Sequence, residues 1–104
     1  MTTPKPDGPD LGEVLPDHLA YQRQLESGGH LVLAGPVSNA AGDQIEGAGL
    51  IIYRAASMEA ARALADADPA HATGARSYTL RKWMVNEGSL NVTVGLSTGA
   101  ASLS

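Results

Sequence analysis

Apolar positions recur along the chain with two different periods, and these periods predict six elements of secondary structure. Residues 16–27 and 57–66 carry apolar side chains every three or four positions, which is the spacing of an amphipathic helix. Short apolar runs or strict alternation, both typical of strands, occupy residues 30–34, 48–54, 76–84 and 90–96. The order helix, strand, strand, helix, strand, strand predicts an α+β fold in which two helices cover one face of an antiparallel sheet.

Proline, glycine and polar residues mark the expected ends of these elements. Pro16 suits the first turn of a helix, and Gly28-Gly29 stops that helix because glycine tolerates the left-handed conformation that follows a helix end. Ser57 is a suitable N-cap for the second helix. Residues 86–88 are predicted to join the last two strands as a hairpin.

The two ends of the chain lack either period. Residues 1–15 contain Pro4, Pro6, Pro9 and two glycines, and we predict that they form a flexible N-terminal tail. The packed domain is expected to span residues 16–97, followed by a C-terminal tail at residues 98–104.

Length and charge narrow the class of protein. A chain of 104 residues forms one domain. A packed part of about 80 residues buries only about 60–65% of its unfolded surface, so we expect a homodimer. The net charge of −4 without a basic run argues against nucleic acid or an anionic membrane as partner, and the absence of cysteine excludes disulfides. No apolar run approaches the length of a membrane span and no signal peptide is evident, so a cytoplasmic protein is expected.

Two side chains capable of proton transfer lie fifty positions apart. Asp68 precedes Pro69, so it is either the N-cap of a short helical turn or a carboxylate oriented for chemistry, and both can hold. His18 borders the inward face of the first helix, where a lone histidine is more often structural than catalytic. A histidine that acts as general base needs a partner that fixes its tautomer, and Asp68 is the leading candidate.

Other polar side chains allow alternatives. His71 follows Asp68 by three residues, so it either shares that pocket or faces solvent in a turn. His18, Asp68 and His71 would together supply the donor set of a metal-binding facial triad, although their spacing does not enforce one. Arg76 and its basic neighbours are too few for a nucleic-acid surface, and they either bind one anionic group or form a solvated strand face.

Two stretches of the chain resemble a known family, the YciI-like (YCII-related) proteins. The similarity extends from Pro16 to Trp83, and the motifs are specific only in combination. The segments that carry it are Pro16-Asp17-His18-Leu19-Ala20-Tyr21, Gly28 to Pro36, Ser57 to Ala61, Ala65-Asp66-Ala67-Asp68-Pro69, Gly74, and Tyr78 to Trp83.

The resemblance implies a ferredoxin-like fold that pairs into a dimeric α+β barrel. It also implies a His–Asp dyad, which falls on His18 and Asp68 in this sequence. The chemistry proposed for such proteins is lyase-like, for example elimination of HCl from chlorinated hydroxylated aromatics, and no cofactor is implied. The family usually opens with a central strand, and here a proline- and glycine-rich stretch holds that place. We therefore expect the strand Leu90–Leu96 to fill the missing position, within its own subunit or across the dimer, and deletion of residues 90–104 to abolish folding.

Together these observations predict a small dimeric enzyme, either a dehydrochlorinase-like lyase or an isomerase. It would act on a small cyclic or aromatic molecule, with His18 as general base or acid and Asp68 orienting it. His71, Arg76 and Tyr78 are candidates for binding a hydroxyl or carboxylate of this small-molecule ligand. The alternative is a non-catalytic small-molecule-binding or dimerisation module with the same fold.

Overall fold

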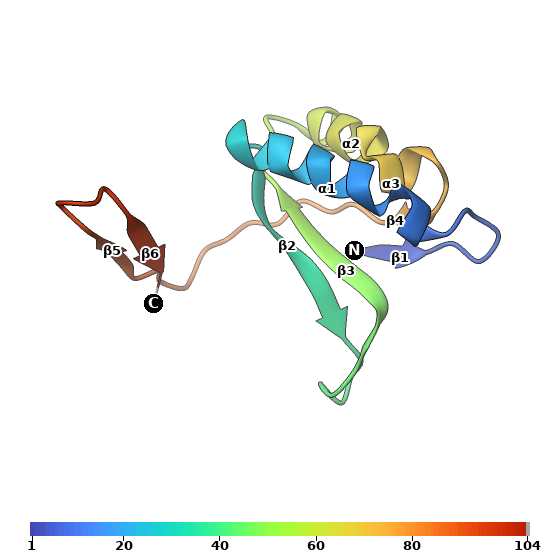
Figure 1. Ribbon diagram of the computed structural model, residues 1–104, viewed down its shortest axis with the longest axis horizontal. Coiled ribbons are helices and arrows are strands. Elements are labelled where there is room, and N and C mark those ends of the chain that lie inside the picture. The colour runs from blue at the N-terminus through green and yellow to red at the C-terminus, as the bar shows by residue number, and fades with distance from the viewer. Residues whose placement is uncertain (104) are drawn as a thin grey trace.

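A four-stranded antiparallel sheet forms the body of the molecule, and helices cover one of its faces (Figure 1). The computed structural model describes residues 1–103, and Ser104, at the end of the predicted C-terminal tail, lies outside them. The elements in chain order are β1 (Thr2–Pro4), α1 (Leu11–Ser27), β2 (Leu31–Ser38), β3 (Ile45–Tyr53), α2 (Met58–Ala67), α3 (Pro69–Ala72), β4 (Arg76–Tyr78), β5 (Val92–Val94) and β6 (Ala101–Leu103).

The strand order of the main sheet is β2-β3-β1-β4, and every neighbouring pair is antiparallel. In this order the two central strands are the first and third along the chain, which is the ferredoxin-like arrangement. The prediction of an α+β fold with an antiparallel sheet and helices on one face is confirmed (Figure 1).

The prediction that residues 1–15 form a tail without a strand is wrong. Strand β1 lies in the middle of the sheet, where Thr2 pairs with Gly49 on one side and with Tyr78 on the other. A strand of three residues is too short to display an alternation, and Pro4 sits at its last position, where the ladder ends. Because β1 occupies the central position, the expectation that residues 90–96 fill it is also wrong. This removes the reason to expect that deletion of residues 90–104 abolishes folding.

Helix α1 begins five residues before the predicted start. The Asp10 side chain accepts a hydrogen bond from the Gly12 amide at 3.1 Å and so caps the helix at Leu11. Pro16 therefore lies inside the helix and not in its first turn. Because proline has no amide hydrogen, this position lacks one hydrogen bond of the helical ladder.

Strand β4 ends at Tyr78, so the predicted strand 76–84 is too long. The alternating residues around β5 do form a strand, but its partner is β6, with Thr93 opposite Ser102. Figure 1 shows this hairpin standing away from the sheet. Its apolar residues are exposed, with Leu96 at 97%. The alternation predicted the strand correctly but not its partner, because the alternation of side chains does not select which strand will pair with it.

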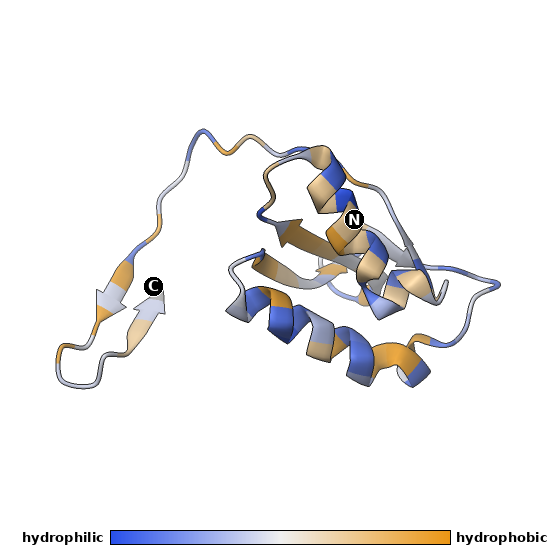
Figure 2. Ribbon diagram, turned by 90° about the horizontal axis from the view of Figure 1, so that it is seen from above, coloured by the Kyte–Doolittle hydropathy of each residue, from blue (hydrophilic) through white to orange (hydrophobic). Residues whose placement is uncertain are grey.

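The core is small and consists mainly of alanine. The buried apolar residues are Leu25, Ala65, Ala70 and Ala75, which lie on α1, on α2, on α3 and just before β4. Figure 2 shows that the helices mix polar and apolar positions while β2 and β3 are largely apolar. Among residues 1–103, no helix is long and apolar enough to cross a membrane.

Candidate functional site

Asp68 occupies the junction of α2 and α3, where it is the last cap of one helix and the first cap of the next. Its Oδ1 accepts a hydrogen bond from the Ala70 amide at 2.9 Å, so the predicted N-cap role is observed. The residue is 0% exposed. A buried carboxylate held by a helix N-terminus is fixed in position and directed toward the neighbouring helix α1.

His18 projects from α1 onto this carboxylate. Its Nδ1 lies 2.7 Å from Oδ1 and 2.9 Å from Oδ2 of Asp68, and the exposed fractions of the two side chains are 14% and 1%. A carboxylate only accepts hydrogen bonds, so Nδ1 carries the proton and the neutral ring presents an unprotonated Nε2. No hydrogen bond to that Nε2 is made within residues 1–103.

Two tyrosine hydroxyls lie within the electrostatic influence of Asp68. The Tyr21 hydroxyl donates to the Leu64 carbonyl at 2.6 Å. The Tyr53 hydroxyl is buried and has no hydrogen-bond partner within residues 1–103. Burial, with the negative charge of Asp68 adding to it, raises the pKa of both hydroxyls above the ordinary tyrosine value. Both therefore remain protonated donors at neutral pH.

His71 is held on both sides of its ring. Its Nδ1 donates to the Ala65 carbonyl at 2.8 Å, and in the neutral ring Nε2 accepts from the Thr2 hydroxyl at 2.9 Å. The ring also lies against Tyr78, with 4.8 Å between the ring centroids. His71 was expected either to share the pocket of Asp68 or to face solvent in a turn. It is half-buried, and its ring nitrogens bond Ala65 and Thr2 and not the Asp68 carboxylate.

Arg76 is buried, at 9% exposure. Its hydrogen bonds to Thr2 hold β1 in the sheet. Its Nε donates to the Thr2 hydroxyl at 3.0 Å, and its Nη2 donates to the carbonyls of Thr2, at 3.0 Å, and of Gly47. Burial lowers the pKa of Arg76, and the negative charge of Asp68 opposes that shift. Arg76 was expected either to lie on a solvated strand face or to bind an anionic group. Its observed contacts match neither expectation.

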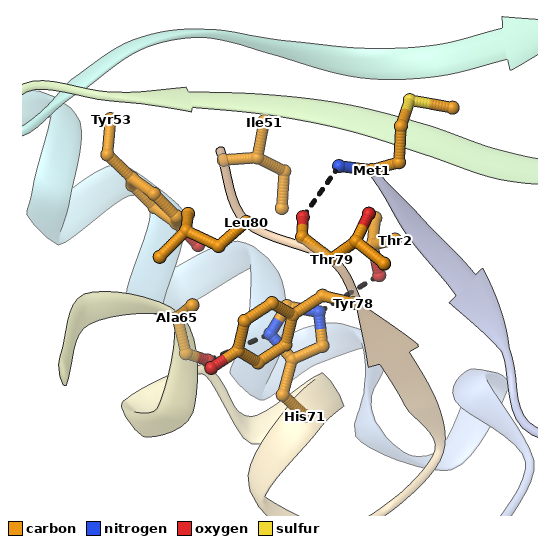
Figure 3. A pocket seen from close by; sticks show the side chains of 9 residues that line it. All are labelled: Met1, Thr2, Ile51, Tyr53, Ala65, His71, Tyr78, Thr79 and Leu80. Atoms are coloured by element: carbon orange, nitrogen blue, oxygen red, sulfur yellow. Dashed lines mark hydrogen bonds between the residues drawn. The ribbon is translucent and has the colours of Figure 1, made fainter. Parts of the chain in front are cut away.

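A pocket opens between the sheet and the segment that links α2 to β4 (Figure 3). Its enclosed space has a volume of about 20 Å³, comparable to one water molecule. Of the three residues predicted to bind substrate, His71 and Tyr78 line it and Arg76 does not, and the predicted catalytic residues His18 and Asp68 do not line it either. The full lining is Met1, Thr2, Ile51, Tyr53, Ala65, His71, Tyr78, Thr79 and Leu80.

The sequence did not indicate two of these polar residues, Thr2 and Tyr53. Thr2 was assigned to a tail, and only its place between β3 and β4 makes its hydroxyl a link between Arg76 and His71. The sequence contained one indication of the position of Tyr53. It lies two residues after Ile51 in β3, so the two side chains share one face of the strand. That indication gives the direction of the side chain but not the state of its hydroxyl.

The facial-triad alternative is not formed. Within residues 1–103, no group of three or more His, Cys, Asp or Glu side chains is placed to hold a metal ion. The physical reason is that both nitrogens of His71 are engaged by Ala65 and Thr2, so they cannot join His18 and Asp68 as ligands.

Comparison with known proteins supports one assignment. The family model described as YCII-related domain matches residues 1–84, which includes β1 and every element of the main sheet. Neither the curated proteins nor the solved structures provided a match. The match covers most of the chain and confirms the resemblance seen in its motifs. The chain therefore belongs to the YCII-related family.

Proposed function

We propose that the protein is a small-molecule enzyme of the lyase or isomerase type, in which His18 transfers a proton and Asp68 orients it. The observation that supports this proposal is the contact of His18 Nδ1 with both oxygens of a buried carboxylate, which also accepts a hydrogen bond from the Ala70 amide. That contact directs the basic lone pair of the ring to Nε2, the nitrogen opposite the carboxylate.

The proposed chemical step begins with removal of a proton from a carbon of the substrate by His18 Nε2. In an elimination, the electron pair of the broken C–H bond forms a carbon–carbon double bond, and chloride leaves with the electrons of its own bond to carbon. In an isomerisation, the protonated ring returns the proton to a different carbon. Asp68 stabilises the imidazolium that forms between these steps, and one positioned base contributes about 10²–10⁴-fold to such a rate.

The substrate class proposed is a small cyclic or aromatic molecule. His71 and Tyr78 line the pocket beside the sheet, which supports the proposal that they contact this substrate. His71 would act through its ring face, because both of its nitrogens already have partners. Arg76 is proposed to act indirectly, since its bonds to Thr2 hold β1 and hence one wall of the pocket.

Exchange of substrate protons with deuterium oxide tests this proposal without knowledge of the product. A panel of small cyclic ketones and chlorinated phenols is incubated with the protein, and loss of individual C–H signals is followed by proton NMR. We expect at least one compound to exchange, and His18→Gln to slow that exchange by about 10²–10⁴-fold.

The matched control is His30→Gln, because His30 lies just before β2 and belongs neither to the ion pair with Asp68 nor to the pocket lining. This variant should exchange at the wild-type rate. Equal rates for wild type and His18→Gln would contradict the proposal, as would a panel in which nothing exchanges.

One observation favours a second candidate, a non-catalytic binding module. The pocket lined by His71 and Tyr78 does not include His18 or Asp68 and encloses only about 20 Å³. For such a module we expect ligands to bind with equal affinity to wild type and His18→Gln, with no exchange in either protein.

A further inference from the structure

The Tyr53 hydroxyl is in an environment that is rare for a polar group in a folded protein. It is a buried donor without a hydrogen-bond partner among residues 1–103, and Tyr53 lines the pocket beside the sheet. Burying a hydroxyl without a partner is unfavourable, because the hydrogen bonds it makes to water when exposed are lost. An acceptor that enters the pocket from outside would remove that cost.

The other buried or half-buried polar side chains of the pocket already have partners, whereas the Thr79 side chain is exposed. His71 uses both ring nitrogens, and the Thr2 hydroxyl lies between His71 and Arg76. The Tyr78 hydroxyl donates to Asp66. Within residues 1–103, Tyr53 is thus the residue of the lining whose buried hydroxyl has no partner (Figure 3).

The residues that line the pocket limit the chemistry of the ligand that carries the acceptor. Ile51, Ala65 and Leu80 give the pocket an apolar lining, and the buried carboxylate of Asp68 lies close enough to influence Tyr53. An ionised group would lose its hydration against these apolar walls, so the ligand is uncharged. The enclosed volume of about 20 Å³ admits one oxygen atom, and the pocket is partly open to solvent, so the remainder of the ligand lies over its mouth.

We propose that Tyr53 donates a hydrogen bond to the oxygen of a small, uncharged, mostly apolar ligand, such as a cyclic ketone, and so selects for that oxygen. The inference rests on the proposed function only where it identifies this ligand with the substrate, because binding is measured without turnover. The raised pKa of Tyr53 supports the role, since the hydroxyl keeps the proton it must donate.

Titration with two ring compounds of the same shape tests the inference. Cyclohexanone carries the acceptor, and methylenecyclohexane replaces its oxygen with a CH₂ group. We expect Tyr53→Phe to weaken cyclohexanone binding about tenfold, the effect of one hydrogen bond, and to leave methylenecyclohexane binding within about twofold of wild type. Dissociation constants come from chemical-shift titrations of the labelled protein, whose spectra also show whether the variant is folded.

Tyr21→Phe is the matched control, because it removes a hydroxyl near Asp68 that already donates to Leu64 and does not line the pocket. It should leave cyclohexanone binding within about twofold of wild type. The inference is overturned if Tyr53→Phe binds cyclohexanone as tightly as wild type, or if cyclohexanone does not bind to wild type.

The two proposals fail separately. Wild-type protein that binds cyclohexanone through Tyr53 but exchanges no substrate protons retains this inference and loses the proposed function. Proton exchange that depends on His18, combined with unchanged cyclohexanone affinity in Tyr53→Phe, retains the proposed function and loses this inference.

Discussion

The two histidines near the α2–α3 junction differ in what remains available on their rings. His71 has a hydrogen-bond partner at each nitrogen, Ala65 at one and Thr2 at the other. His18 uses only Nδ1, and its partner is a carboxylate. A proton-transfer group needs one nitrogen that can change its protonation state, so these contacts favour His18 for chemistry and His71 for holding structure.

Tyr53 should also affect stability at alkaline pH. Its pKa in the folded protein is raised above the ordinary value of 10.0, mainly by burial and then by the charge of Asp68. As the pH rises above that value, the unfolded chain loses the proton while the folded chain keeps it, so the free energy of unfolding falls. We predict a smaller fall in Tyr53→Phe than in wild type between about pH 9 and about pH 11, measured from urea midpoints.

The other ionisable groups are common to both proteins, so their contributions cancel in the comparison. Parallel curves for the two proteins would show that the Tyr53 hydroxyl is as well solvated in the folded state as in the unfolded chain. Such a result would also remove one support for its role in the pocket.

Residue-level prediction from the sequence succeeded where the chemistry is local. The cap at Asp68 follows from aspartate before proline, and the proximity of His18 was expected from the helical face together with the family motifs. The roles of Arg76 and His71 were not predictable, because both depend on Thr2, which the sequence pattern assigned to a tail. Three-residue strands carry too little pattern for detection.

Strand β1 is short, yet it links much of the site. The Thr2 hydroxyl accepts from Arg76 and donates to His71, and its backbone carbonyl accepts a second bond from Arg76. The family match begins at residue 1 and so includes this strand. Its position between β3 and β4 joins the two halves of the sheet, which explains how three residues can have a large structural effect.

We predict that Thr2→Val destabilises the fold by about 1–3 kcal/mol, because the nearly isosteric side chain leaves the Nε of Arg76 without an acceptor. Thr3→Val is the matched control, since the Thr3 hydroxyl is exposed and its one hydrogen-bond contact, to Ser77, is long at 3.4 Å. The free energy of unfolding of this variant should stay within about 0.5 kcal/mol of wild type. Urea denaturation followed by circular dichroism gives both values. Equal stabilities for the two variants would mean that water replaces the Thr2 hydroxyl at Arg76.

The elements beyond β4 show that the periodicity of a segment predicts a strand but not the partner of that strand. Residues 90–96 alternate cleanly and do contain β5, but their partner is β6 and not the strand predicted before them. Alternation reports that a segment is extended with two unlike faces, whereas pairing depends on the rest of the fold. This hairpin lies beyond residue 84, where the family match ends.

At the scale of the whole molecule, one face of the sheet is left without a cover. Ile51 and Tyr53 line the pocket on the helical side, so the alternating residues Leu50 and Ile52 point to the opposite face. Leu33 is the cross-strand partner of Ile52 and shares that face. An apolar sheet face is typically buried against a second layer, and helices cover only the other side (Figure 1).

A second copy of the chain would supply that layer, which is the dimer expected from the small core and from the family resemblance. We predict that the wild-type protein sediments as a dimer, and that Leu50→Asp, at a side chain 42% exposed in the single chain, converts it to a monomer by placing a charge in the interface. Met58→Asp is the control, because Met58 begins α2 on the helical side and is equally exposed. Sedimentation velocity gives the masses. A monomeric wild type would contradict the dimer. A dimer that survives Leu50→Asp would place the partner on another surface, because a charge facing an apolar sheet across an interface cannot be accommodated without loss of affinity.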